Sequence, residues 1–404
     1  MSAPLEGLRV VEVAGWMAAP GATVILADLG ADVIKVEPPR GDAMRGLTRQ
    51  PHLPDGRTVD TGFELDNRGK RSIAIAMNEP EGAELVRRLV DRADVFVNNL
   101  LARRQKRFGL DADTLLARNP RLVHATLTGY GLEGPDAARP GYDITAFFGR
   151  GAITHTITEP GSVAPRARPA QGDHTTSLAL VASILTALRL VEQTGQGQVI
   201  DVNLLATAVW VMSTDLSSTL VDGQNPTTHG RRNRYHALQE SFKCADERFI
   251  LLFMPEPHWW PRFCEAVGRP EWIEDPRFAT FDARKQNMDA VTDAMDELFA
   301  TRTLAEWGEL FDEQGFIWAP AATVAELAQD RQAEALGVFP EIPHPVAGSL
   351  RTVANPLRIR GADTAPRRPA PDLGAQTAEI LADIGIGAEE AEALAEAGVV
   401  ARPH

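Results

Sequence analysis

The opening of the chain alternates short β-branched runs with a helical stretch. Leu8–Val13 and Asp32–Val36 are predicted strands, and the apolar spacing of Val24–Leu29 predicts a helix between them that ends at Gly30. Two strands joined by a helix pair in parallel through a right-handed crossover. This order therefore restricts the first part of the chain to an α/β fold with a parallel sheet.

The same alternation continues as far as Val202. Further strands are predicted at Ser72–Met77, Val95–Asn99, Arg121–Thr126 and Val199–Val202, with helices at Glu79–Asp91 and after Asp173. Strands that alternate with helices in this way are typical of a doubly wound sheet with helices on both faces. We therefore expect a Rossmann-like large domain.

The composition changes in the polar, turn-rich stretch Asp222–Arg234. Predicted strands and helices then follow at Phe242–Cys244, Phe249–Phe253, Trp259–Val267, Met288–Phe299 and Leu304–Gln314, with a final helix at Gly374–Ile384. We expect the large domain to span residues 1–215, completed by 335–404, and a smaller α+β domain to span 225–330.

Several common catalytic and cofactor-binding motifs are missing from the sequence. The turn AGWMAAPG after the first strand lacks G-x-G-x-x-G, so the Rossmann-like shape comes without the dinucleotide signature. No P-loop and no G-x-S-x-G elbow occurs. The histidines never pair at the i, i+4 spacing of zinc-binding helices, and Cys244 and Cys264 lack metal-ligand spacing. We predict no metal site.

Charge and hydropathy restrict the partners and the compartment. The formal net charge of −14 is unfavourable for binding nucleic acid. The N-terminus has no basic segment before an apolar run, and no uninterrupted apolar stretch reaches the roughly 18 residues of a membrane span. With two cysteines in 404 residues, we expect a cytoplasmic protein without membrane association.

Cations are nonetheless clustered on this acidic chain. Arg103, Arg104, Lys106 and Arg107 lie within one short stretch. Such a cluster fits a small polyanionic ligand, and solvated surface charge is the commoner explanation.

A single carboxylate, Asp173, stands between a glycine and a long apolar helix. Aspartate is a preferred N-cap residue, because it accepts hydrogen bonds from the first amides of a helix. A carboxylate at a loop–helix junction can also face a cleft and act as a nucleophile. This segment alone favours the cap and leaves both roles open.

Blocks along essentially the whole chain resemble one enzyme family. The first block reads PLEGLRVVEVAGWMAAPGATVILADLGADVIKVEPPRGDAMR, and later ones include NRGKRSIAIAM, NPRLVHATLTGYGLEGP, PGYDITAFF, TGQGQVIDVNLL and EWIEDPRFATFDARKQN. In this order they resemble the class III CoA-transferases, the CaiB/BaiF family that includes carnitine-CoA and formyl-CoA transferases.

The resemblance implies an enzyme that moves CoA from an acyl-CoA donor to a carboxylic acid acceptor, through an aspartyl anhydride and an aspartyl-CoA thioester. Asp173 takes the position of the catalytic aspartate. The CoA-binding positions of the family fall at Met17, Ala18, Arg40, Ile75, Met77, Asn78, Asn99, Leu100, Arg107, Thr128 and Tyr130. CoA is a substrate here, and no tightly bound cofactor is implied. The family also implies a homodimer of interlocked subunits, with Arg231–Tyr235 as candidate substrate contacts.

This sequence departs from the family pattern at several positions. Leu101, Ala102 and Arg103 replace an R-P-G found in many members. Pro38 stands where some members have a CoA-binding arginine, and Thr128 replaces a lysine. These departures leave the donor and acceptor acids open.

The alternative within the same fold is an α-methylacyl-CoA racemase, which moves an α-proton with a histidine and an aspartate. Its motif G-H-D-I-N-Y has a histidine where this chain, with GYDITAF, has Tyr142. Tyrosine is a poor base near neutral pH, because its unperturbed pKa is about 10. The sequence therefore favours the transferase, with His155 and His174 as candidate bases for the alternative.

Overall fold

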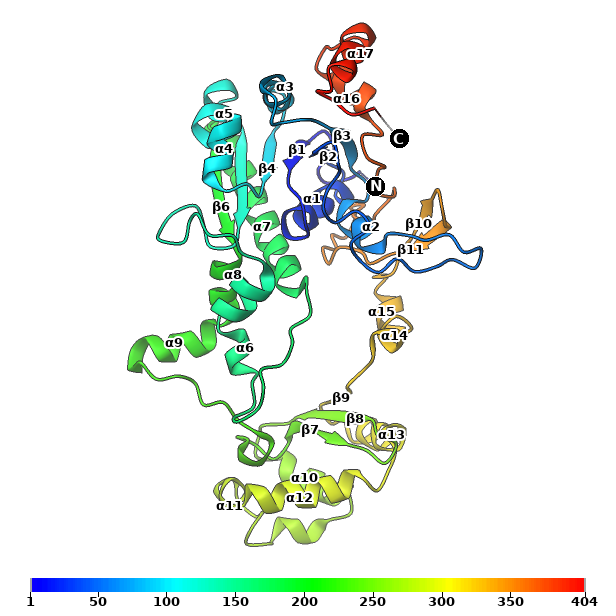
Figure 1. Cartoon of the computed structure of the whole chain (residues 1–404). Coiled ribbons are helices and arrows are strands. Elements are labelled where there is room, and N and C mark those ends of the chain that lie inside the picture. Colours follow the sequence, from blue (N-terminus) through cyan, green and yellow to red (C-terminus); the bar gives the residue numbers. More distant parts are fainter. Residues whose placement is uncertain (1, 403–404) are drawn as a thin grey trace. The chain divides into compact units, whose positions relative to one another are not determined.

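The computed structural model describes residues 2–402 and divides them into two compact units (Figure 1). The larger unit holds the residues up to His155, Arg166–Gln224 and those from Arg331 onward, and the smaller holds Thr156–Pro165 and Asn225–Asp330. We expected Thr156–Pro165 in the large domain. It joins the small unit instead, where the Glu159 carboxylate accepts a hydrogen bond from the Arg231 amide at 3.2 Å.

A six-stranded parallel sheet forms the centre of the larger unit, in the order β3-β2-β1-β4-β5-β6. Its strands are β1 (Arg9–Val13), β2 (Asp32–Glu37), β3 (Arg71–Ala74), β4 (Val95–Asn98), β5 (Val123–Thr128) and β6 (Gln198–Asn203). The predicted α/β class with a parallel sheet is confirmed. The strand order reverses between β1 and β4, which is where open α/β sheets form a ligand crevice.

Two hydrophobic cores lie on opposite faces of this sheet, because successive side chains of a strand point to opposite sides. Val10 and Val33 pack with α1 (Ala18–Asp28) and α7 (Gln171–Thr194), while their neighbours Val11 and Ile34 pack on the other face. The helices of that second face include α3 (Pro80–Val90), α16 (Thr377–Asp383) and α17 (Ala388–Glu396).

The remaining elements outside the small unit are mostly short. They are α2 (Thr61–Asn67), α4 (Ala102–Phe108), α5 (Ala112–Arg118), the π-helix η1 (Asp143–Arg150), α6 (Ile153–Thr156), α8 (Leu204–Val211), α9 (Ser213–Asp222), α15 (Arg331–Ala335) and the hairpin of β10 (Glu341–His344) and β11 (Gly348–Arg351).

The C-terminal segment lies along the edge of β3. The Ala401 amide donates to the Ala74 carbonyl at 3.0 Å, and the Ala76 amide donates to the Val399 carbonyl at 2.9 Å. The Gly374 amide donates to Ser72 Oγ at 3.0 Å. The end of the chain thus covers a strand edge that would otherwise present unpaired backbone groups.

Helix α7 is long and apolar enough to cross a membrane by length and composition, as is the bent pair of α8 and α9. In the larger unit, one face of α7 carries Leu180, Val181 and Ile184, which are buried with α1 and the sheet. Its position is that of a core helix packed on a parallel sheet.

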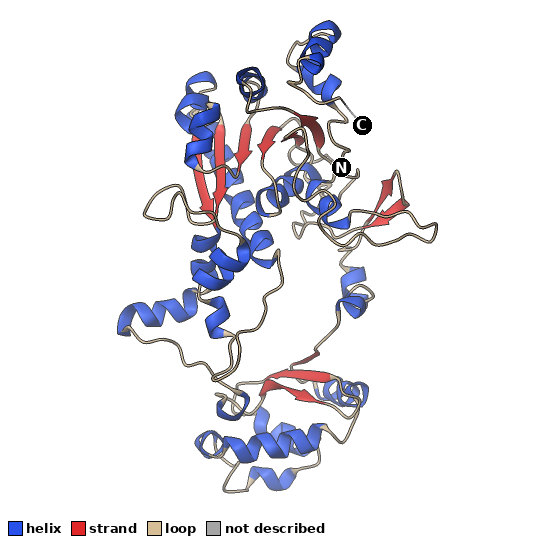
Figure 2. Cartoon of the chain, in the orientation of Figure 1, coloured by secondary structure: helices blue, strands red, loops and turns tan. Residues whose placement is uncertain are grey.

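The smaller unit has an antiparallel sheet in the order β7-β8-β9 and a helical layer (Figure 2). Its elements are β7 (Gln239–Lys243), β8 (Phe249–Phe253), β9 (Trp318–Pro320), η2 (Arg231–Asn233), α10 (Trp259–Ala266), η3 (Pro270–Ile273), α11 (Phe281–Gln286), α12 (Met288–Phe299), α13 (Leu304–Gln314) and α14 (Val324–Leu327). Aromatic side chains dominate its core, where the rings of Phe242 and Phe299 stack 4.6 Å apart.

A buried network of charges ties the first two strands to the elements that follow them. Lys35 Nζ lies 2.8 Å from Glu12 Oε1 and 2.8 Å from Asp42 Oδ2, and Lys70 Nζ lies 2.7 Å from Glu12 Oε2. Burial opposes the ionisation of Glu12, but the charges of Lys35 and Lys70 outweigh it and lower the pKa of Glu12 to about 2. Lys35 also donates to the Ala14 carbonyl at 3.0 Å, which fixes the loop after β1.

Replacing Lys35 tests this network. Lys35→Met should lower the free energy of unfolding by about 3–5 kcal/mol, because it leaves buried carboxylates with one cation fewer. Urea unfolding followed by circular dichroism measures the loss. Arg57→Met is the matched control, since Arg57 pairs with Asp55 on the exposed surface. If Lys35→Met lowered the free energy of unfolding no more than Arg57→Met does, the buried network would not have the stabilising role given to it here.

Candidate active site

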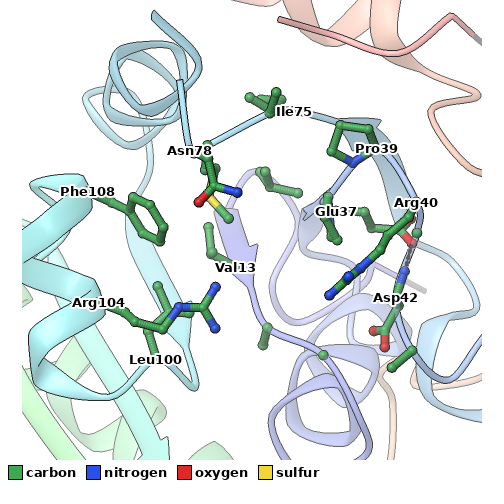
Figure 3. Close-up of a pocket in the computed structure, with 18 of the residues that line it drawn as sticks. Val13, Glu37, Pro39, Arg40, Asp42, Ile75, Asn78, Leu100, Arg104 and Phe108 are labelled. Carbon is green, nitrogen blue, oxygen red and sulfur yellow. Dashed lines mark hydrogen bonds between the residues drawn. The ribbon is translucent and has the colours of Figure 1, made fainter. Parts of the chain in front are cut away.

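A cavity of about 560 Å³ opens at the carboxyl ends of β1 to β4 (Figure 3). Its walls come from the segments that follow these four strands. The lining consists of residues 13–16, 36–43 and 75–79 together with Asn99, Leu100, Arg104 and Phe108. The cavity therefore occupies the crevice where β1 and β4 adjoin and the strand order reverses.

Two cations face each other across this cavity. Figure 3 shows the guanidinium groups of Arg40, from the loop after β2, and Arg104, from α4, pointing inward from opposite walls. Within residues 2–402, neither side chain forms an ion pair. Unpaired guanidinium groups present fixed forks of donors that match phosphate oxygens. The cavity is thus suited to a ligand with several phosphate charges.

The loop between β1 and α1 forms one wall and is held from two sides. Asn99 Nδ2 donates to the Gly15 carbonyl at 2.8 Å, and the Trp16 amide donates to Asp42 Oδ1 at 3.2 Å. A Cβ on Gly15 would lie 3.1 Å from Asp42 Oδ1, so a larger residue would push these groups apart. Because Lys35 fixes the other oxygen of Asp42, the buried network also sets the position of this wall.

Asp173 lies in the first turn of α7. The helix begins at Gln171, and its N-cap is Ala170, which has a φ of 77° and makes no side-chain capping bond. The interpretation of Asp173 as the N-cap is therefore wrong, because the chain enters the helix three residues earlier. The Asp173 carboxylate is partly buried, and within residues 2–402 it accepts no hydrogen bond.

Three other ionisable side chains surround this carboxylate. Burial raises the pKa of Asp173 to about 7; the charges of Asp143 and Asp66 add to this rise and that of His174 opposes it. Asp143 is 4% exposed, and its Oδ2 has no hydrogen-bond partner in the described part of the chain. His174 Nε2 lies 3.0 Å from Asp66 Oδ1, and this hydrogen bond raises the pKa of the imidazole.

Close packing brings two elements to the first turn of α7. On one side α1 approaches, where Ser177 Oγ donates to the Ala18 carbonyl at 2.6 Å and a Cβ on Gly21 would lie 2.7 Å from Ser177 Oγ. On the other side lies η1, where a Cβ on Gly172 would lie 2.6 Å from the Phe147 ring. Glycine at both contacts lets the helices approach the turn that carries Asp173.

The structure gathers about half of the predicted CoA-binding residues in the cavity. Those that line it are Arg40, Ile75, Met77, Asn78, Asn99 and Leu100. Those that do not line it are Met17, Ala18, Arg107, Thr128 and Tyr130. Two of these five residues, Thr128 and Tyr130, make other contacts. Thr128 Oγ1 accepts a hydrogen bond from the Gly131 amide at 2.8 Å, and the Tyr130 ring lies under the guanidinium groups of Arg139 and Arg150.

Arg104 was missed as a cavity residue, although it belongs to the basic cluster of the sequence. Positions three apart on a helix lie on the same face, so the spacing of Arg104 and Arg107 indicated two equivalent candidates.

The sequence also suggested Arg231 and Arg232 of the small unit as substrate contacts. In the structure both pair with carboxylates of α12: Arg231 with Asp296, and Arg232 with Asp289 and Asp293. Within residues 2–402, no three His, Cys, Asp or Glu side chains are grouped to hold a metal ion.

Comparison with known proteins places the chain in a family. The model of CoA-transferase family III matches residues 5–377. This chain belongs to that family. It is accordingly a family III CoA-transferase, and the family's substrates are CoA thioesters and carboxylic acids.

Similar proteins of known structure or activity extend over nearly the whole chain. The (R)-2-hydroxy-4-methylpentanoate CoA-transferase of Clostridioides difficile is 31% identical over 93% of this chain and 94% of its own. The mouse succinyl-CoA:glutarate CoA-transferase is 31% identical over 94% and 86%. A CaiB/BaiF family protein from Brucella suis superimposes with a TM-score of 0.85 and 32% identity, over 95% of this chain and 100% of its own.

Substitution of the two cavity arginines tests the site. Arg40→Gln and Arg104→Gln should each weaken binding of free CoA about tenfold or more, because each removes charge-assisted hydrogen bonds to phosphate. Isothermal titration calorimetry with CoA measures the change. Arg107→Gln is the matched control on the same helix, since Arg107 lies outside the lining. A loss at Arg107 as large as at Arg104 would instead favour the assignment made from the sequence.

Proposed function

We propose that Asp173 is the nucleophile of the CoA transfer and that the cavity binds the nucleotide part of CoA. The observation that carries this proposal is a partly buried carboxylate to which no described residue donates a hydrogen bond, in a helical turn against α1. Trp16 lines the cavity, and Met17 and Ala18 follow it directly in the chain. The same short segment thus borders both the cavity and the turn that carries Asp173.

In the first half-reaction the Asp173 carboxylate attacks the thioester carbonyl of the donor acyl-CoA. The C–S bond breaks, CoA leaves as a thiolate, and a mixed anhydride forms between the acyl group and Asp173. The thiolate then attacks the aspartyl carbonyl, which releases the donor acid as a carboxylate and leaves an aspartyl-CoA thioester. Splitting one exchange into steps of similar energy is what covalent catalysis provides.

The second half-reaction reverses this order with the acceptor. The acceptor carboxylate attacks the aspartyl thioester, and the CoA thiolate leaves as a second mixed anhydride forms. The thiolate then attacks the acceptor carbonyl, which forms the new thioester and regenerates the Asp173 carboxylate. No proton or electron is gained or lost overall, so the chemistry requires no tightly bound cofactor.

The surroundings of Asp173 support this role. A carboxyl group with a pKa of about 7 is ionised in an appreciable fraction at neutral pH, and a partly desolvated carboxylate without hydrogen bonds is a stronger nucleophile than one in water. The first turn of α7 has no side-chain cap. Backbone amides at the start of a helix can stabilise negative charge such as that on the attacked thioester oxygen.

The names of the relatives do not define the acids. The substrates in these names include a branched hydroxy acid, the dicarboxylic acids glutarate and oxalate, and the aromatic compounds cinnamoyl-CoA and phenyllactate. All share an acyl-CoA donor or product and a carboxylic acid, and we propose these two classes as the substrates here.

We further propose that the protein is a cytoplasmic homodimer. Helices α8 and α9 carry an exposed apolar surface that includes Trp210, Leu220 and Val221. Trp210 is 78% exposed, and large apolar side chains left exposed on neighbouring helices favour an interface between subunits. A monomeric mass by light scattering would contradict the dimer.

Trapping of the aspartyl thioester tests the function. With a productive acyl-CoA donor, borohydride should reduce the Asp173 carboxyl to an alcohol, and mass spectrometry of the peptide that contains it detects the change. The yield should fall as the pH is lowered through about 7, because a protonated carboxyl is not nucleophilic and the pKa of Asp173 is raised to about 7.

Asp113 provides the control for this experiment, since it is an exposed carboxylate in the first turn of α5. Asp113→Asn should trap normally, whereas Asp173→Asn should not trap at all. Modification at another carboxylate in the wild-type enzyme would refute the assignment of Asp173. Uptake of solvent deuterium at the acyl α-carbon, without any adduct, would indicate racemase chemistry instead.

A further inference from the structure

Two exposed aromatic rings meet in the larger unit. The ring centroids of Trp16 and Tyr142 lie 5.1 Å apart, with an interplanar angle of 73°. Trp16 is 39% exposed and Tyr142 is 53% exposed. The nearby rings of Phe147 and Phe148 are buried in a core with Leu204 and Ala208. The edge-to-face pair of Trp16 and Tyr142 is therefore an accessible aromatic surface in this region.

The chain positions of the two rings place them beside the turn that carries Asp173. Trp16 directly precedes Met17 and α1, and Tyr142 directly precedes Asp143 and η1. These are the elements that flank the first turn of α7. Asp143 lies close enough to Asp173 to raise its pKa, and Trp16 also lines the cavity. The ring pair thus connects the cavity with the surroundings of the nucleophile.

The backbone of Trp16 is held in a conformation that a tryptophan rarely adopts. Its φ is +69°, in the left-handed region that favours glycine. The hydrogen bond from its amide to Asp42, which Lys35 fixes in turn, keeps it there. A non-glycine residue in this region costs free energy and persists only where the surroundings impose it, which is frequent at ligand sites.

The charges around Asp173 disfavour a second carboxylate on the substrate. Asp66, Asp143 and Asp173 itself are acidic, and His174 is the cation among the groups that act on Asp173. His174 is engaged by Asp66 at 3.0 Å. A dicarboxylic acid bound here would place its free carboxylate near this excess of negative charge.

We propose that Trp16 and Tyr142 bind the hydrocarbon part of the acyl group and select aryl or bulky apolar monocarboxylic acids over dicarboxylic acids. This specificity rests on the proposed role of Asp173, because it assigns the acyl group to the space beside that residue. The aromatic surface supplies attraction for an apolar acyl group, and the acidic cluster supplies repulsion of a second carboxylate.

Equilibrium binding to Asp173→Asn tests this without turnover. Calorimetric titration with phenylacetyl-CoA should give a dissociation constant at least about tenfold lower than with succinyl-CoA, since burial of an aromatic group is worth more than this factor. Adding Trp16→Ala should remove most of this preference, and Trp16→Phe should restore most of it. Phe253→Ala, which removes an exposed ring from β8 in the small unit, is the matched control and should leave the preference unchanged.

Equal binding of the two thioesters to Asp173→Asn would overturn the proposal, as would equal weakening of both by Trp16→Ala. Because Asp173→Asn has no nucleophile, these outcomes do not depend on whether a covalent intermediate forms. Failure of the borohydride trapping would refute the role of Asp173 alone, and loss of the binding preference would refute the specificity alone.

Discussion

The buried ion pairs of Lys35 hold together the part of the molecule on which the site depends. Lys35 lies on β2 and contacts Glu12 on β1, Asp42 in the loop after β2 and the Ala14 carbonyl after β1. Charges taken out of water are costly unless each is paired and hydrogen-bonded. Here Glu12 contacts two lysines and also accepts a hydrogen bond from Thr23 on α1. The network favours this arrangement of the strands, the loop and the helix, because moving them apart would leave buried charges unpaired.

Asp42 and α1 connect this buried network to the candidate site. Asp42 orients the backbone of Trp16, and α1 begins two residues later and packs on α7 at Gly21. The cavity and the turn that carries Asp173 are thus joined by one short segment. Burial, Asp143 and Asp66 oppose the negative charge of Asp173 and raise its pKa to about 7. Proteins commonly accept such a loss of stability at reactive groups.

Much of the fold followed from local patterns. The predicted helices Met288–Phe299 and Leu304–Gln314 agree with α12 and α13 at both ends, and each has strong apolar periodicity. The strand predicted at Ser72–Met77 is shorter in the structure, where β3 ends at Ala74. The Ile75 amide still donates to the Glu37 carbonyl at the end of β2, but the Ala76 amide donates to the Val399 carbonyl in the C-terminal segment. That partner lies more than 300 residues away in the sequence, and no local pattern could have indicated it.

The sequence by itself determined the fold class, the family and Asp173 as the candidate nucleophile, because periodicity, motif order and residue identity are properties of the chain. Tertiary structure alone decided that Asp173 is not a cap and that Arg104 faces the cavity. It also decided that Trp16 meets Tyr142, and that Asp143 and Asp66 act on the carboxyl group of Asp173. The contacts around Trp16 and Asp173 depend on how closely α1, η1 and α7 approach one another. That approach is set by packing between segments distant in sequence, which a local pattern does not contain.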